Sequence, residues 1–151
     1  MKRWNGWGDD SIELVVNPDA LQFLEQRIGA GVSPVDATLA QACSGIPPSR
    51  LPQHKLVDTS PEARLRCSLG HSLPDWLKMR SGKVGAVTDG VAYPESSEQV
   101  RELLDYAQAC GAAVIPMGGG TSVVGHLTVP EGAQAVLTIN MSRLCRLINL
   151  D

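Results

Sequence analysis

The chain has 151 residues, of which 43% are hydrophobic and 19% are charged, and its formal net charge at pH 7 is −3. This composition is typical of one globular domain, and the acidic balance argues against a nucleic-acid partner, because binding a polyanion normally requires a basic face. No run of about 18 apolar residues indicates a membrane span. The first ten residues, MKRWNGWGDD, also lack the apolar core of a signal peptide. We therefore expect a cytoplasmic protein.

The side chains that most often bind metals or act as nucleophiles are scattered along the sequence. No CxxC pair occurs among the four cysteines, which are Cys43, Cys67, Cys110 and Cys145. The three histidines, His54, His71 and His126, are each isolated in sequence from any nucleophile or paired carboxylate. The sequence therefore predicts no metal site, no disulfide framework and no catalytic residue in this chain.

Up to about residue 83 the chain is expected to form short helices, because capping residues, prolines and glycines recur at helical spacing. The expected helices cover 17–29, 33–45, a segment from about 60, and 74–82. The apolar faces of the first two consist of Leu21, Leu24 and Ile28, and of Val35, Leu39 and Ala42. The second of these faces is expected to be buried.

From residue 84 onward the pattern predicts alternating strands and helices. A strand at 90–93 precedes a helix with a Ser96–Gln99 capping box, and a second strand follows at 112–115. The buried positions expected on that helix are Val100, Leu103, Leu104 and Ala107. A strand, helix and strand in this order predict a right-handed parallel crossover. Further strands are expected at 135–140, buried on both faces, and at 147–151.

Directly after the strand at 112–115 comes the sequence PMGGGTSVVG, residues 116–125. Three consecutive glycines remove every Cβ that would keep the backbone away from a ligand, and they permit positive φ angles. Ligands of parallel sheets bind at the carboxyl ends of the strands, where this loop begins. No Lys or Arg occurs between Arg101 and Arg143. We therefore expect an anion such as a diphosphate to be held by amide groups and by the hydroxyls of Thr121 and Ser122.

This loop fits neither of the two best-known nucleotide-binding patterns. Val123 occupies the third glycine position of the GxGxxG pattern counted from Gly118, and the GK[ST] ending of a phosphate-binding P-loop is absent. Glycine clusters also occur in tight turns and in close helix packing. The residues alone therefore leave a structural turn and a less common phosphate-binding loop as alternatives.

The pattern Pro-x-Gly-Gly-Gly-Thr-Ser, preceded by the helix YPESSEQVRELLDYAQ, resembles the first half of the FAD-binding domain of the vanillyl-alcohol oxidase and para-cresol methylhydroxylase flavoprotein family. Four further segments are similar to the alkyldihydroxyacetonephosphate synthase branch of that family. They are WNGWGD at 4–9, SRLP at 49–52, LGHSLPDWLKMRSGKVG at 69–85 and LTINMSRLCRLINLD at 137–151. The resemblance thus extends over nearly the whole chain.

The resemblance implies an α+β fold, with an N-terminal helical segment (1–83) followed by the first β-α-β subdomain of a PCMH-type FAD-binding domain (84–151). It implies that the FAD diphosphate is wrapped by the loop residues Pro116, Met117, Gly118, Gly119, Gly120, Thr121 and Ser122. Covalent members of the family carry the flavin on a histidine in this loop, which is absent here, so the FAD is expected to be non-covalent. His126 is the histidine expected nearest to the cofactor.

The family's flavin domain extends further than this sequence, and its catalytic tyrosine, histidine and arginine lie in a separate cap domain. The resemblance therefore implies a truncated, catalytically incomplete chain that needs its missing C-terminal half or another chain, and that could form homo-oligomers. The synthase reaction exchanges an acyl for an alkyl group on a dihydroxyacetone phosphate ester. Two alternatives are a fragment of an FAD-dependent 2-hydroxy-acid dehydrogenase of the lactate or glycolate type, and an inactive remnant that serves only as an interaction scaffold.

Overall fold

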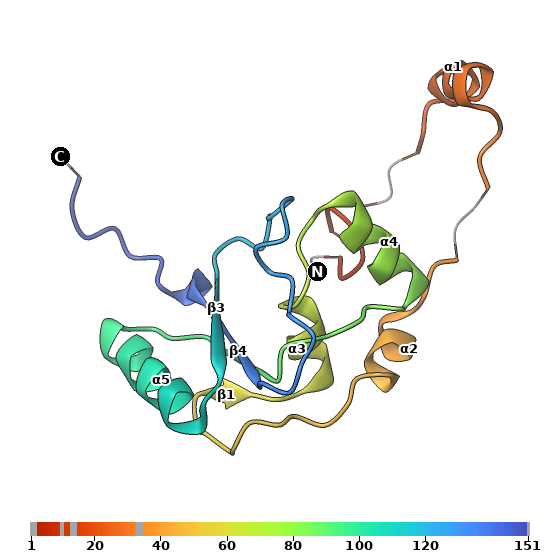
Figure 1. The fold of residues 1–151 in the computed structure, drawn as a ribbon. Coiled ribbons are helices and arrows are strands. Elements are labelled where there is room, and N and C mark those ends of the chain that lie inside the picture. Colours follow the sequence, from red (N-terminus) through yellow and green to blue (C-terminus); the bar gives the residue numbers. More distant parts are fainter. Residues whose placement is uncertain (1–2, 10, 13–14, 33–34, 151) are drawn as a thin grey trace.

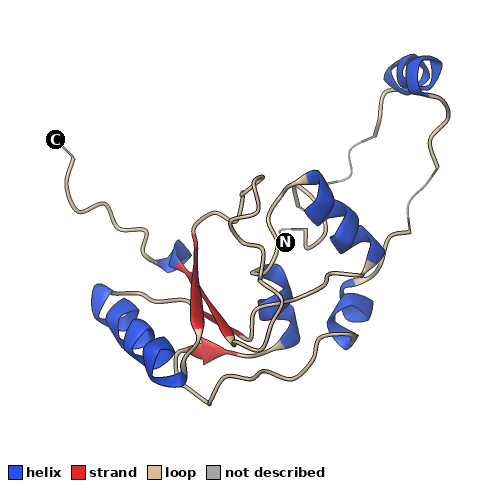
Figure 2. Cartoon of the chain, in the orientation of Figure 1, coloured by secondary structure: helices blue, strands red, loops and turns tan. Residues whose placement is uncertain are grey.

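The computed structural model describes residues 3–9, 11–12, 15–32 and 35–150. Within them it is an α+β structure in which a small sheet separates α5 from α3 (Figure 1, Figure 2). The helices are α1 (Pro18–Ile28), α2 (Leu39–Ser44), α3 (Pro61–Arg66), α4 (Leu73–Ser81), α5 (Ser97–Cys110) and the short 3-10 helix η1 (Met141–Arg143). The strands are β1 (Val57–Asp58), β2 (Gly90–Ala92), β3 (Ala113–Met117) and β4 (Val136–Asn140). The predicted fold class is confirmed.

The sheet has the strand order β1-β2-β4-β3, and β2 and β3 are both parallel to β4. The expected parallel arrangement is therefore present, but β2 and β3 are not neighbours, because β4 lies between them. All five residues of β4 are buried, as predicted, because the strand lies at the centre of the sheet and is covered on both faces. The carboxyl ends of these three strands consequently meet at one edge of the sheet.

Each face of the sheet packs against a different part of the chain. On one face Leu137 and Ile139 belong to a buried cluster with Leu103 and Ala107 of α5. On the other face Val91, Ile115 and Val136 cluster with Cys67, which directly follows α3. The strands alternate between the two clusters, as the period of two in a β-strand requires. The result is a thin sheet covered on both sides, with its carboxyl edge open to a ligand.

Helix α5 confirms the sequence expectation in position and in its principal buried residues, Leu103 and Ala107. Leu104, which was expected to be buried, is 48% exposed because it lies at the margin of the apolar face. The predicted capping box is only half formed. The Ser96 side chain accepts a hydrogen bond from the Gln99 amide, but Gln99 Oε1 accepts from the Glu95 amide at 2.7 Å instead of from Ser96.

The substitution Ser96→Ala removes this cap and should cost about 1 kcal/mol of unfolding free energy, the usual effect of losing a serine N-cap. For a domain of this size, that corresponds to a fall in the thermal unfolding midpoint of roughly 2–4 °C. Circular dichroism measured during a thermal scan tests it, with Ser96→Thr as the control that keeps a hydroxyl acceptor. Equal midpoints for the alanine variant and the wild type would contradict this role.

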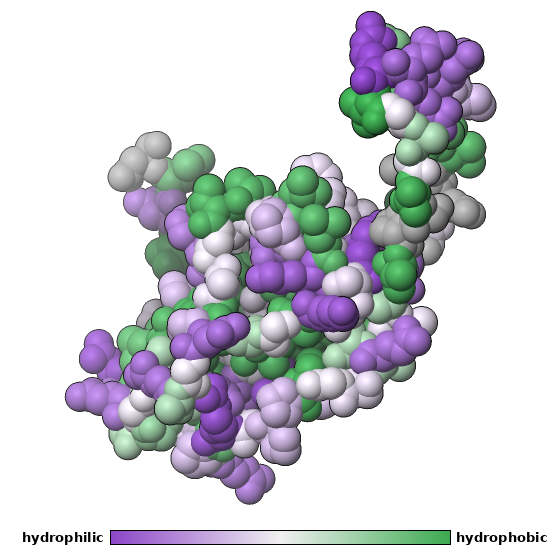
Figure 3. Space-filling model, turned by 45° about the vertical axis from the view of Figure 1, so that its right-hand side comes forward, coloured by the Kyte–Doolittle hydropathy of each residue, from purple (hydrophilic) through white to green (hydrophobic). Residues whose placement is uncertain are grey.

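The apolar face predicted for α1 is not buried. The helix begins after the Asn17 cap and ends before Gly29 as expected, but it projects away from the rest of the molecule (Figure 1), and its apolar residues form part of the exposed surface (Figure 3). Leu21, Leu24 and Ile28 are among the exposed large hydrophobic residues. Amphipathic spacing predicted the helix correctly, but it cannot tell whether another element covers the apolar face.

Two other expectations about secondary structure are wrong in part. Helix α2 begins at Leu39, after a capping box formed by Thr38 and Gln41, so Val35 precedes the helix and is exposed while Ala42 is buried. The predicted start at 33–34 lies outside the described residues. Residues 147–150 form no strand, because no described strand pairs with them, and Asp151 lies outside the described residues.

The helices starting near 60 and 74 are confirmed as α3 and α4. None of the helices described is long and apolar enough to cross a bilayer.

Candidate functional site

The glycine-rich loop leaves the sheet at its carboxyl edge, as expected. Met117 is the last residue of β3 and lies opposite Asn140, the last residue of β4. Residues 118–122 continue beyond this pair as irregular backbone. Pro116 and Met117 therefore belong to the strand, and the other five predicted cofactor residues form the loop.

The three glycines of the loop differ in the space that surrounds them. At Gly120 the backbone has φ +72°, and a Cβ added there would lie 2.6 Å from Met117 Cε. A Cβ added at Gly118 would meet nothing within 4 Å, and one at Gly119 would meet only Thr121 Cγ2, at 3.9 Å. Both of these glycines are exposed, whereas Gly120 is buried. Thus the fold itself requires glycine at 120, but it leaves open space beside 118 and 119, as a cradle for a ligand would.

Three main-chain donors of the loop have no acceptor among the described residues. Among the described residues, none accepts a hydrogen bond from the amides of Gly120, Thr121 or Ser122. The carbonyl oxygen of Ser122 accepts a hydrogen bond from the His71 amide at 2.7 Å. The Ser122 hydroxyl oxygen accepts one from the His126 amide at 3.1 Å. Ser122 is therefore held in place by the hydrogen bonds that its carbonyl and hydroxyl oxygens accept, while its own amide donates to no described residue.

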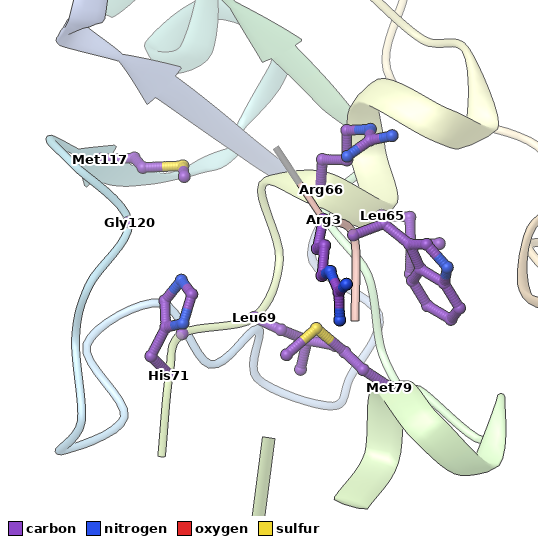
Figure 4. A pocket seen from close by; sticks show the side chains of 10 residues that line it. Arg3, Leu65, Arg66, Leu69, His71, Met79, Met117 and Gly120 are labelled. Carbon is purple, nitrogen blue, oxygen red and sulfur yellow. The ribbon is translucent and has the colours of Figure 1, made fainter. Parts of the chain in front are cut away.

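A cavity of about 320 Å³ lies between this loop and the N-terminal part of the chain (Figure 4). Its lining residues are Arg3, Trp4, Leu65, Arg66, Leu69, Gly70, His71, Met79, Met117 and Gly120. Met117 and Gly120 are the two predicted cofactor residues that line it. The lining is mainly apolar, and three of its residues, Arg3, Arg66 and His71, have charged or polar side chains. This composition is typical of a small-molecule site.

Two arginines that lie far from the loop in sequence, Arg3 and Arg66, line this cavity. Arg3 donates to the carbonyl oxygens of Asp9 and Ile12, at 3.3 and 2.9 Å, and Arg66 Nε donates to Glu62 Oε1 at 2.8 Å. Both residues precede the loop by more than 50 positions. Local sequence around the loop therefore gave no indication of these positive charges.

Both His71 and His126 contact Ser122 of the loop through their amides, but only the His71 side chain lines the cavity. The His71 ring lies at the cavity below Gly120 (Figure 4), whereas His126 is exposed and is not among the lining residues. His71 Nδ1 accepts a hydrogen bond from Trp76 Nε1 at 3.4 Å. The segment around His71 had been noted only for its resemblance, because an isolated histidine carries no local signal of its position.

Beneath the loop, a group of polar and sulfur-containing side chains ties the strand ends together. Asn140 Nδ2 contacts Cys67 Sγ at 3.6 Å and Met117 Sδ at 3.7 Å, and the Tyr93 hydroxyl lies 3.6 Å from Cys67 Sγ. Burial, together with the hydrogen bond to Cys67, raises the pKa of Tyr93 above its ordinary value, so this hydroxyl stays protonated at neutral pH. No group of three metal-binding side chains occurs among the described residues.

Residues 88–151 match the family model described as "FAD binding domain". Curated relatives include the alkyldihydroxyacetonephosphate synthases of Caenorhabditis elegans (26% identical), Dictyostelium discoideum (26%) and Trypanosoma brucei brucei (24%). Each alignment covers 99% of this chain, which spans 30% of the length of these relatives. The predicted resemblance is thereby confirmed, and the match to the FAD-binding domain model lies in residues 88–151.

Two solved structures of alkyldihydroxyacetonephosphate synthase have the same fold. The TM-scores are 0.76 and 0.73 at 22% sequence identity, and each match covers 99% of this chain and 34% of the other. The boundary predicted near residue 84 and the roles of residues 116–122 stay predictions.

Proposed function

We propose that this chain, which is related over its length to the alkyldihydroxyacetonephosphate synthases, provides the FAD-binding portion of a flavoprotein of that kind. In this proposal FAD is held without a covalent bond, and its diphosphate lies against Pro116 and Met117 at the end of β3 and against the loop formed by Gly118, Gly119, Gly120, Thr121 and Ser122. The observation that carries the proposal is the open space beside Gly118 and Gly119, next to the amides of Gly120, Thr121 and Ser122, for which no described residue provides a hydrogen-bond acceptor. The fold gives no reason of its own for that space.

The residues of the chain fit the chemistry of a diphosphate. Amide groups of an irregular loop at a strand end bind phosphate oxygens well, and the hydroxyls of Thr121 and Ser122 add two further donors. The Arg3 side chain brings positive charge to the adjoining cavity (Figure 4), whereas the guanidinium group of Arg66 is paired with Glu62. When bound, FAD supplies a ring that accepts and returns electrons. The chain's own part is to bind and orient that cofactor.

Titrating FAD into the purified 151-residue chain tests the proposal. Binding should quench flavin fluorescence and shift the visible absorbance band, and FAD should bind more tightly than riboflavin, which lacks the diphosphate. Because Pro116–Ser122 contains no histidine, cysteine or tyrosine, acid precipitation of the complex should release all of the flavin into the supernatant. Flavin that stays with the precipitate would contradict non-covalent attachment.

The same titration separates the alternative functions. An absence of any response to FAD would contradict the proposal and favour the interaction-scaffold hypothesis. A 2-hydroxy-acid dehydrogenase would use the same loop, but the reported relatives are synthases, which favours the synthase-like alternative. The cytoplasmic location, homo-oligomers and dependence on further polypeptide stay predictions.

A further inference from the structure

We propose that Gly70 and His71 are positioning residues that hold the glycine loop in the shape that binds the diphosphate. This inference rests on the proposed function, because it names the contact on which the affinity of the loop depends. Both residues lie outside residues 88–151, which match the FAD-binding domain model. They therefore extend the site into the N-terminal part of the chain.

The first part of the argument is the close approach of two segments that are distant in sequence. The His71 amide donates to the Ser122 carbonyl oxygen at 2.7 Å. A Cβ added to Gly70 would collide with the same carbonyl oxygen, and it would also lie 3.2 Å from Asp75 Oδ2. The φ angle of Gly70 is outside the left-handed region. Glycine is thus required at position 70 for space and not for backbone conformation.

The segment that carries Gly70 and His71 is itself fixed at both ends. Before it, the buried Ser68 hydroxyl donates to the Arg64 carbonyl oxygen at 2.6 Å and accepts from the Thr88 amide at 2.8 Å. After it, Ser72 and Asp75 form a capping box at the start of α4. Asp75 is only 4% exposed, so this box is shielded from competing water. The segment can therefore act as a rigid support.

The loop spans the distance between two fixed points. Met117 is held by its pairing with Asn140 in β4, and Ser122 is held by the support at Gly70 and His71. Between these points the loop amides keep a defined direction, so little conformational freedom is lost when a ligand binds. If the support is removed, those amides sample many directions and affinity falls.

The test replaces Gly70 with alanine in the full 151-residue chain and measures FAD affinity together with hydrogen exchange of the loop amides. Gly45→Ala is the matched control, because Gly45 has an ordinary φ of −88° and a Cβ there would meet only the Ala42 carbonyl oxygen, at 3.9 Å. Measurements are made well below the unfolding midpoint of each variant. We expect Gly70→Ala to bind FAD at least tenfold more weakly, with faster exchange in 118–122, and Gly45→Ala to match the wild type.

Ser72→Ala provides a second variant should Gly70→Ala not fold. It loosens one end of the support without filling the space at position 70, and it should weaken FAD binding and speed loop exchange to a smaller extent. Ser72→Thr keeps the hydroxyl and should restore both values. A purely structural role would leave loop exchange and FAD affinity unchanged in folded protein.

Unchanged loop exchange in folded Gly70→Ala, or in folded Ser72→Ala where the first does not fold, overturns the inference, whatever the flavin result. An absence of FAD binding by the wild type instead overturns the proposed function, and faster loop exchange would then still establish the support. The two failures are therefore distinguishable.

Discussion

Replacing Gly118 with valine is expected to abolish FAD binding while leaving the unfolding midpoint near its wild-type value. Gly118 is exposed, its φ is outside the left-handed region, and a Cβ there has no neighbour within 4 Å, so the free protein has room for the side chain. A bound diphosphate would occupy that room. We expect an affinity loss of at least about 100-fold, equivalent to about 3 kcal/mol of binding free energy. Fluorescence titration and a thermal scan measure the two effects separately.

Gly120→Ala is the matched comparison, because it should damage binding and stability together. Its positive φ of +72° is unfavourable for alanine, and the new Cβ would press on Met117 Cε. The unfolding free energy should therefore fall by roughly 1–3 kcal/mol. Wild-type affinity in Gly118→Val would contradict the close approach of ligand to this loop, and equal stability losses in the two variants would contradict the division of roles between the glycines.

Features with a local signal could be predicted from the sequence. Helix α5 carries a cap, an apolar stripe and a terminal glycine within 16 residues, and β4 carries Val, Leu, Thr and Ile in succession. The glycine loop could be placed because it directly follows a strand. In each case the residues that determine the structure are neighbours in the chain.

Features that depend on distant contacts could not be predicted. The insertion of β4 between β2 and β3 depends on which strand is best buried by the whole sheet. The approach of Arg3, Arg66 and His71 to the loop depends on how the N-terminal segments pack. The apolar residues of α1 have the spacing of a core helix, but this spacing does not determine whether another element packs against them. Local patterns thus predicted the position of the glycine loop in the fold but not the residues that surround it.

The second large effect concerns the buried carboxylate of Asp89, and Asp89→Ala should destabilise the fold strongly. Asp89 is 2% exposed and accepts hydrogen bonds from Arg50 Nε at 2.8 Å, Arg50 Nη2 at 2.7 Å and the Val136 amide at 2.9 Å. Arg50 also donates to the Gly132 carbonyl oxygen at 2.8 Å, so this pair ties the N-terminal part of the chain to the sheet. Removing the carboxylate leaves the buried Val136 amide without an acceptor and the partly exposed Arg50 without its partner, which typically costs about 1–3 kcal/mol. Urea denaturation at pH 7 measures the loss.

The pH dependence of stability provides an independent check on this ion pair. Burial alone would raise the pKa of Asp89, but hydrogen bonds from Arg50 and Val136 lower it below its ordinary value. A carboxyl group whose pKa is lower in the folded state than in the unfolded state stabilises the fold. This stabilisation is complete at pH values above the pKa in the unfolded state, about 3.9, and it is lost as the pH falls through the pKa in the folded state. The difference in unfolding free energy between the wild type and Asp89→Asn should therefore be constant from pH 7 to 5 and shrink below about pH 4.

Asp105→Asn, which changes an exposed carboxylate of α5, should match the wild type at every pH. A difference for Asp89→Asn that stays constant down to pH 3 would show that the charge of Asp89 does not stabilise the fold, and that its role is limited to shape and neutral hydrogen bonding.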